Sequence, residues 1–372
     1  MPPNRRRFLQ ASLALYAVTY LSGGLANNLT AKILHQAEEV EKQKQAWQTL
    51  RLASPYRMAD FDFIPHMHLQ LKQHIESLTQ GKVYVEIYDN GALGVGRALM
   101  AAVTRGRIDA ALISVSNLSR ALPLLDILNI PFWLNSDQAY LNLITSPTWQ
   151  KMVLQPIQTH SKLTVLLQHV VGSRTMTTTK HYKRLINTPD ALTDVTMRVP
   201  ASRVLNHFYS MTAANVVGVP WDKAAQLARN GQIDALDPSV VGLYAGPDNL
   251  KNEIGQVAKI ASVPDAWVTV LNQQWLAELP TKLKQQVEEA SQLIFSAHLA
   301  EIKALQQRCE MGLKQAGAEI YQPSRDELAL WQSRYGHHKQ AWNSIKSELL
   351  GSTLAFNQLL DATQTPSKYS LS

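Results

Sequence analysis

The chain of 372 residues is 45% hydrophobic and 17% charged, contains one cysteine, and carries a formal net charge of +7. This length predicts two domains, and the composition excludes disordered, collagen-like and coiled-coil proteins, while a single cysteine excludes an intramolecular disulfide. The Lys and Arg residues are scattered, with no basic run interleaved with aromatic residues. We therefore expect an anionic ligand or surface and no nucleic-acid partner.

Residues 1–26 have the pattern of an export signal. Arg5-Arg6-Arg7-Phe8-Leu9 precedes an apolar stretch at 11–21, and small residues follow up to Ala26. This order is typical of a signal peptide, and the apolar stretch is shorter than the about 20 residues of a membrane span. Two arginines followed by x-Phe-Leu resemble the twin-arginine export signal, which a receptor reads. An ordinary secretory signal is the alternative, and either route predicts a periplasmic protein.

Residues 27–47 are predicted to form a helical spacer. Ile33, Leu34, Ala37 and Val40 recur at helical spacing among Glu, Lys and Gln residues. A solvated helix outside the core is the favoured interpretation, and a dimerisation helix is the alternative. We accordingly expect a monomer, with a dimer as the second possibility.

From Trp47 on, short apolar runs typical of strands alternate with segments of helical periodicity. Strands are predicted at 49–53, 83–88 and 108–113, and helices at 63–78 and 97–105. The alternation returns later, with strands at 196–199, 216–219 and 233–236 and helices at 204–211 and 222–229. Such alternation indicates an α/β fold with a largely parallel sheet.

The phrase Gly-x-Ile-Asp-Ala occurs twice, beginning at Gly106 and at Gly231. Because the two copies lie far apart, they predict two similar lobes rather than a solenoid. A further helical pattern runs from Pro280 to Ala316 and stops at Gly317. At 1.5 Å per residue this helix would be about 55 Å long, enough to cross both lobes.

These patterns divide the chain into five parts. They are a signal peptide at 1–26, a spacer at 27–47, lobe I at 48–171 plus 264–303, lobe II at 172–263 plus 304–350, and a C-terminal tail at 351–372.

Taken together, these stretches resemble the TRAP-transporter solute-binding proteins, a family typified by C4-dicarboxylate binding. The similarity runs roughly from residue 49 to 335, in the family's order, and rests on 81–94, 106–111 with 130–134, 188–192 with 197–199, and 220–221 with 231–235. The resemblance implies a two-lobed periplasmic-binding-protein clamshell, each lobe a mostly parallel sheet flanked by helices, with a long helix across both. It also implies capture of a small organic carboxylate, delivery to integral membrane subunits of a TRAP transporter, and no enzymatic activity.

Three candidate binding residues follow from this resemblance. Arg198 matches the family arginine that pairs with the ligand carboxylate, Arg174 matches a second arginine, and Trp221 stands where the family has an aromatic residue after proline. The setting of Arg198 supports its role independently, because a charge in an apolar strand is costly unless paired, and a guanidinium suits a carboxylate. The alternatives are a protein carboxylate partner for Arg198, a solvated surface position for Arg174 and a core position for Trp221.

Three further candidates are weaker. Ser116 and Asn117, after Ser114, follow a buried strand at its C-terminal end, where α/β sheets bind ligands, although loop polarity alone would also explain them. Asp237 stands where the family has an acidic residue before Asn-Pro, whereas here Pro238-Ser239 follows. This departure leaves the acid open among dicarboxylates, keto or hydroxy acids, sugar acids and sialic acid.

The sequence predicts no metal or cofactor. His66 and His68 lie on different faces of their helix, so we expect solvated histidines rather than ligands. Two other functions are weighed. A binding protein of an ABC importer for an organic anion or amino acid would share the same fold, whereas an exported α/β hydrolase would need a Gly-x-Ser-x-Gly elbow, which the sequence lacks.

Overall fold

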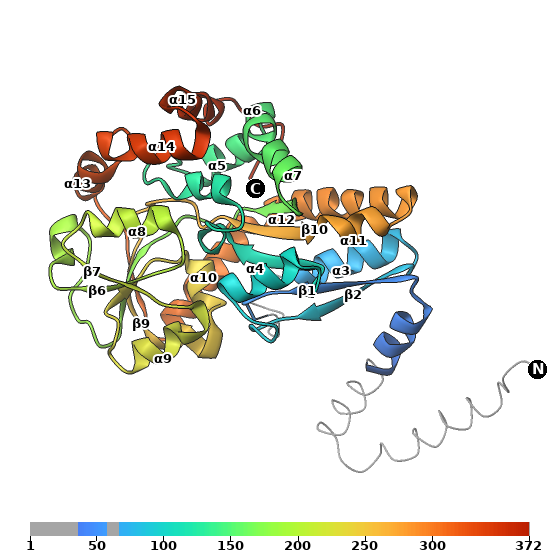
Figure 1. Cartoon of the computed structure of the whole chain (residues 1–372). Coiled ribbons are helices and arrows are strands. Elements are labelled where there is room, and N and C mark those ends of the chain that lie inside the picture. Colours follow the sequence, from blue (N-terminus) through green and yellow to red (C-terminus); the bar gives the residue numbers. More distant parts are fainter. Residues whose placement is uncertain (1–35, 58–66, 372) are drawn as a thin grey trace, which may run out of the picture.

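The structure is a computed structural model that describes residues 36–57 and 67–371. The predicted twin-arginine signal and residues 27–35 of the predicted spacer lie outside these residues. Two β-sheets, each covered by helices, form the two lobes, and the long helix α12 runs beside both (Figure 1). No helix in the two described ranges combines the length and apolar character that crossing a membrane requires.

The first sheet has five strands in the order β2-β1-β3-β10-β4. They are β1 (Gln48–Ala53), β2 (Val83–Tyr88), β3 (Ala110–Ser114), β4 (Leu163–His169) and β10 (Trp267–Asn272). β1 pairs in parallel with β2 and β3, and β10 runs antiparallel to both of its neighbours. Every residue of β3 is buried, as expected for a continuous apolar run that is covered on both faces.

The second sheet has six strands in the order β11-β9-β5-β8-β6-β7. They are β5 (Met176–Thr179), β6 (Thr196–Val199), β7 (Asn215–Gly218), β8 (Ala235–Leu236), β9 (Ile254–Ala258) and β11 (Glu319–Tyr321). β6 pairs in parallel with β7 and β8, whereas β5 runs antiparallel to β8 and β9. The two-lobed α/β clamshell is therefore confirmed, and both sheets are mixed, with one reversed strand inside each.

Helices cover both sheets. The helices of the first lobe are α3 (Met67–Leu78), α4 (Gly96–Thr104), α5 (Asp137–Ile144), α6 (Pro147–Trp149), α7 (Gln155–His160) and α11 (Gln273–Glu278). Those on the second are α8 (Arg203–Ser210), α9 (Ala224–Arg229) and α10 (Val240–Tyr244). In α3 the buried residues Met67, Leu71 and Ile75 recur every fourth position, which gives the helix one apolar face toward the core.

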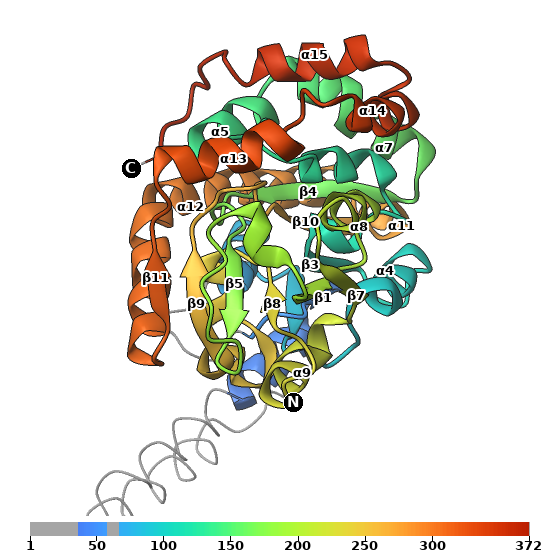
Figure 2. The same ribbon diagram turned by 90° about the vertical axis from the view of Figure 1, so that its left-hand side faces the viewer.

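The 35-residue helix α12 (Thr281–Gln315) links the lobes. It packs against α3 and β4 of the first lobe and against α10 and β11 of the second (Figure 2). Gly312 permits this second contact, because a Cβ atom there would lie 2.2 Å from the ring of Tyr244. The predicted long helix across both lobes is thus confirmed.

The chain ends in three helices, α13 (Arg325–Tyr335), α14 (Asn343–Leu350) and α15 (Thr353–Ala362). α14 packs on the 3-10 helix Pro123–Asn129, and α15 packs on α5 and α6 of the first lobe. Phe356 and Leu359 of α15 are fully buried. The segment predicted as a tail therefore contains a packed helix.

Residues 36–45 form a helix that docks on the first lobe through Glu39. The Glu39 carboxylate lies 2.7 Å from the ammonium groups of Lys42 and Lys72 and accepts a hydrogen bond of 3.1 Å from the hydroxyl of Tyr84. Partial burial alone would raise the pKa of Glu39, but hydrogen bonds from the two lysines outweigh it and lower this pKa to about 2.

Candidate functional site

The candidate site lies where two chain segments cross between the sheets. Residues 170–175 run from β4 to β5, and residues 259–266 run back from β9 to β10. The amide of Arg174 donates to the carbonyl of Val263 at 2.8 Å, and the amide of Asp265 donates to that of Gly172 at 2.9 Å. This pairing fixes Arg174 and Asp265 between the two lobes.

Arg174 is 3% exposed and its guanidinium is held by acidic and hydroxyl groups. Nη1 donates to Asp237 at 2.9 Å, and Nη2 donates to Asp265 at 3.0 Å and to Ser116 at 2.8 Å. Burial alone would lower the pKa of Arg174, but the charges of Asp237 and Asp265 outweigh it and raise this pKa. Arg174 is therefore a buried, doubly paired cation, and the alternative of a solvated surface position is wrong.

The two aspartates are themselves fixed by neighbouring groups. Asp237 follows β8 and accepts a 3.3 Å hydrogen bond from the hydroxyl of Tyr209, and its burial raises its pKa. Asp265 accepts hydrogen bonds from the amide and hydroxyl of Ser239, at 3.0 and 2.9 Å, at the start of α10. A Cβ atom at Gly242 would lie 2.9 Å from Asp265, so only glycine lets α10 approach this carboxylate.

Arg198 is equally buried, at 2% exposed, but no acidic side chain among the described residues forms an ion pair with it. Within the described ranges no carboxylate lies within 4.0 Å of its guanidinium. Nε and Nη2 both donate to the carbonyl of Val219, at 3.1 and 2.8 Å, and Nη1 has no hydrogen-bond partner in the part of the chain that the structure describes. Burial lowers the pKa of Arg198 to about 10, so the group stays charged at neutral pH.

Three aromatic rings border the two arginines. Trp221 is 7% exposed, and its ring centroid lies 5.2 Å from the guanidinium carbon of Arg198. Tyr56 stacks on Trp267 with centroids 3.6 Å apart and meets the edge of Trp221 at 6.4 Å. Trp221 Nε1 is buried without a hydrogen-bond partner in the described part of the chain. The site thus combines a charged centre with aromatic walls.

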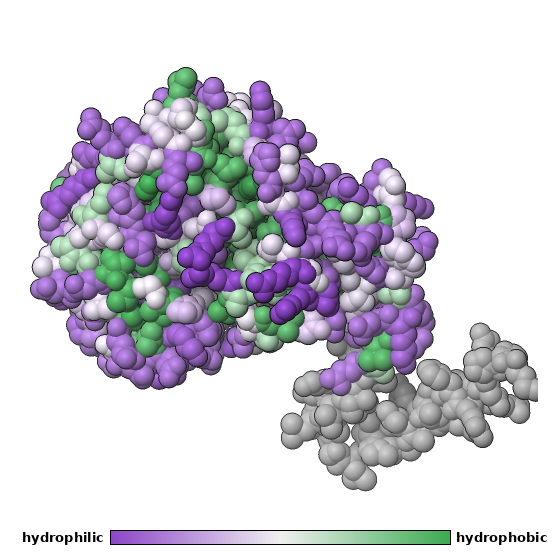
Figure 3. Space-filling model, in the orientation of Figure 1, coloured by the Kyte–Doolittle hydropathy of each residue, from purple (hydrophilic) through white to green (hydrophobic). Residues whose placement is uncertain are grey.

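A small cavity of about 20 Å³ lies at the centre of this group, and its lining comes from both lobes. This volume holds about one water molecule. Beside it lies a cleft of about 1250 Å³, which shares Asn117, Pro200 and Trp221 with the cavity. Strongly hydrophilic residues gather near the junction of the lobes in Figure 3. Trp221 therefore stands between a small inner cavity and a much larger outer cleft.

All six candidate residues lie at this junction. Arg174, Arg198, Trp221, Ser116 and Asn117 line the cavity, and Asp237 contacts it through Arg174. The alternative of a protein carboxylate for Arg198 does not hold within the described residues, whereas Arg174 has two such partners. Their roles in ligand binding stay predictions.

Tyr56, Trp267 and the role of Asp265 were not predicted from the sequence. Tyr56 follows Ser54-Pro55 at the C-terminal end of β1, beside the end of β3. The rule that selected Ser116 could also have found Tyr56. Trp267 begins β10, whose reversed direction brings it to the same edge opposite Ser114, and nothing in the sequence indicated that direction.

The prediction of solvated histidines is wrong for His68. It is 2% exposed in α3, and burial lowers its pKa to about 4. His169 and His298 are also buried, with ring centroids 5.7 Å apart. Even so, the described residues contain no group of three or more His, Cys, Asp or Glu arranged to hold a metal ion.

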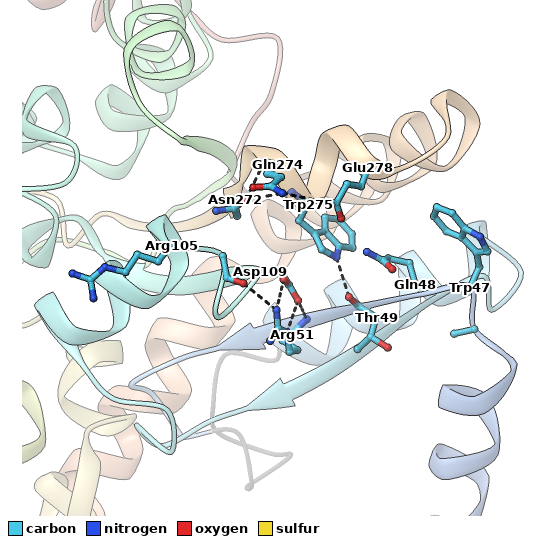
Figure 4. Close-up of a pocket in the computed structure, with 12 residues that line it drawn as sticks. Trp47, Gln48, Thr49, Arg51, Arg105, Asp109, Asn272, Gln274, Trp275 and Glu278 are labelled. Carbon is cyan, nitrogen blue, oxygen red and sulfur yellow. Dashed lines mark hydrogen bonds and ion pairs between the residues drawn. The ribbon is translucent and has the colours of Figure 1, made fainter.

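A separate cavity of about 500 Å³ lies at the opposite end of the first sheet (Figure 4). Of the two arginines that line it, Arg105 is exposed and Arg51 is already paired with Asp109 at 2.8 Å, and the indole nitrogen of Trp275 donates to the carbonyl of Thr49 at 2.9 Å (Figure 4). Because these groups satisfy one another, this cavity is a weaker candidate than the lobe junction.

Comparison with protein families gives one match that spans most of the chain. The DctP family, described as bacterial extracellular solute-binding protein, family 7, matches residues 65–344. No curated protein gives a match.

Solved structures share the fold at low sequence identity. A TRAP periplasmic solute-binding protein from Bordetella bronchiseptica, with density assigned to pantoate, is 18% identical with a TM-score of 0.74 and covers 86% of this chain and 99% of its own. One from Pseudomonas aeruginosa with bound L-malate is 16% identical (TM-score 0.71, coverage 80% and 99%). The sugar acid binding protein from Advenella mimigardefordensis with galactonate is 16% identical (TM-score 0.74, coverage 85% and 97%).

Proposed function

Because this chain belongs to family 7 of the bacterial extracellular solute-binding proteins, we propose that it captures a small organic carboxylate and delivers it to the membrane subunits of a TRAP transporter. The observation that carries the proposal is Arg198. A buried guanidinium without a carboxylate partner in the described residues is costly, and a ligand carboxylate would relieve that cost. The ligands named for similar structures include L-malate and galactonate, which are both carboxylates.

The proposed capture requires the lobes to separate first. The inner cavity of about 20 Å³ has no room for an organic acid, while the outer cleft meets it at Trp221. Opening the junction would bring Arg198 into contact with the cleft, and closure would then surround the ligand. Hinge motion between two domains is a common way to enclose a small ligand.

Binding without conversion fits the chemistry of the junction. Ser114 and Ser116 contact each other and Arg174, and in the described residues no histidine is hydrogen-bonded to a serine hydroxyl. A serine nucleophile needs such a base, so a hydrolase is the weaker reading. An ABC importer partner is disfavoured by the family match.

We further propose export to the periplasm by the twin-arginine route, motivated by Arg5 and Arg6.

A thermal-shift screen tests the proposed function. The mature protein is heated with a panel of mono- and dicarboxylates, sugar acids, neutral sugars and amino acids. A ligand that binds the native state raises the melting temperature, by an amount that grows with its concentration over the dissociation constant. We expect shifts from one or more carboxylates and none from neutral sugars. Shifts from neutral sugars alone would contradict the proposal.

A further inference from the structure

We propose that the site is specific for monocarboxylates with an uncharged body and discriminates against dicarboxylates. This inference rests on the proposed function, because it assumes that a carboxylate binds at Arg198. It concerns the charge that the remainder of the ligand, apart from this carboxylate, can carry.

The charges of the site are already balanced before any ligand binds. Arg174 and Arg198 supply two positive charges, and Asp237 and Asp265 supply two negative ones, all within a buried region. One ligand carboxylate leaves the region with one excess negative charge, and a second carboxylate would leave it with two. Excess charge of one sign is costly where water is excluded.

Arg174 is not free to accept a second carboxylate. Its Nη1 and Nη2 atoms face Asp237 and Asp265 at 2.9 and 3.0 Å, so two anions already match its charge. Its Nε atom has no hydrogen-bond partner among the residues described, but it could donate to an uncharged ligand oxygen as well as to a carboxylate. Of the two buried arginines at this junction, Arg198 is the one without an ion pair to any described residue.

The walls around Arg198 suit an uncharged ligand body. The rings of Tyr56, Trp221 and Trp267 line the cavity together with Pro200 and Pro238. The indole nitrogen of Trp221 can donate one hydrogen bond, which suits a hydroxyl or keto oxygen. Arg97 and Arg120 line the outer cleft, but both are exposed, where ion pairs contribute little.

Calorimetric titration with matched acids tests this specificity. Butyrate is compared with succinate, pentanoate with glutarate, and 3-phenylpropionate with its 4-carboxy derivative. Within each pair that binds, we expect the diacid to bind at least about tenfold more weakly. Equal or tighter binding of the diacids would overturn the specificity and leave the proposed function standing. An absence of binding by every carboxylate would instead overturn the proposed function.

Variants in which one aspartate is made neutral test whether the charges of Asp237 and Asp265 cause the discrimination against diacids. Asp237→Asn and Asp265→Asn each remove one negative charge beside Arg174, so each should improve diacid binding relative to monoacid by about tenfold. Glu348→Gln is the matched control, because its partner Arg203 is an exposed cation in the outer cleft. It should leave the ratio unchanged. If one variant does not show a cooperative melting curve, the test relies on the other variant and on the matched acids titrated into the wild-type protein. An unchanged ratio in a folded variant would overturn the explanation.

Discussion

Arg174 and Arg198 are equally buried but differ in their partners. Arg174 is paired with two aspartates, whereas among the described residues Arg198 donates only to the carbonyl of Val219. A paired guanidinium holds parts of the protein together, whereas one without an acidic partner retains a favourable interaction for an incoming anion. The two arginines should therefore respond differently to substitution.

Replacement of Arg198 should weaken ligand binding much more than it affects folding. Loss of one partner of a buried charge pair typically costs about 2–5 kcal/mol, so Arg198→Ala should lower affinity roughly 30- to 4,000-fold. Arg198→Lys keeps the charge without the two-pronged geometry and should lose less. Calorimetric titration measures affinity, and a melting curve without ligand measures folding. Arg203→Ala, at an exposed arginine of the same cleft, is the control. Retained affinity with a lowered melting temperature would remove Arg198 from the site.

At the scale of elements, the helix at 36–45 is attached to the first lobe by a cluster of charges rather than by apolar packing. Glu39 bridges to Lys72, which also contacts Glu76 at 2.5 Å and lies 4.0 Å from the ring centre of Tyr84. The pKa of Glu39 is lowered to about 2, so the carboxylate stabilises this docking in its charged form. Such a contribution is complete above the unfolded pKa of about 4.5 and is lost as the pH falls toward 2.

Glu39→Gln should therefore loosen the helix at neutral pH but not in strong acid. With allowance for solvent screening, we expect a loss of about 1–2 kcal/mol, or roughly a five- to thirtyfold faster amide hydrogen exchange in residues 36–45. The difference from wild type should shrink as the pH falls from 4.5 to 2. Glu41→Gln, on the exposed side of the same helix, serves as the control. Equal exchange in both variants at pH 7 would contradict this role of Glu39.

The elements that could be predicted from the sequence are those with a clear local side-chain periodicity, whereas the strands β4, β5, β9, β10 and β11 were not predicted. The strands at 83–88 and 196–199 have the predicted bounds, and the long helix at 281–315 differs by one residue at each end. Strand direction could not be predicted, since an apolar run reads alike in both directions. The reversed β10 brings Trp267 to the site. Likewise, Arg174 was found, but its pairing with Asp265, 91 residues away, depends on how two segments cross.

At the scale of the whole molecule, four connections within residues 67–371 tie the lobes together. They are the segments 170–175 and 259–266, the helix α12, and the chain that leads from β11 to α14. Arg174 and Asp265 lie on the first two segments. Opening of the cleft must therefore bend the two segments that carry the buried ion pair between Arg174 and Asp265.

Delivery to a transporter also requires export, which should depend on Arg5 and Arg6. Replacement of both with Lys keeps the charge but removes the paired guanidinium groups that we expect the export receptor to read, so the precursor should accumulate in the cytoplasm. Arg7→Lys, at the variable position of the motif, is the control and should be exported normally. Fractionation of cells followed by immunoblotting measures the outcome. Unchanged periplasmic recovery of the double variant would indicate the general secretory route.

The position of β10 between β3 and β4 has a consequence for biosynthesis. A ribosome produces the chain from the N-terminus at about 5–20 residues per second, and β5 to β9 of the other sheet are made before β10. The first sheet cannot close until Asn272 has emerged, and the second cannot close until Tyr321 has emerged. The first sheet can therefore close only after β5 to β9 of the second sheet have been made, and the second sheet is completed later still. The nascent chain carries the unpaired edges of β3 and β4 through much of its synthesis, when protection by chaperones matters most.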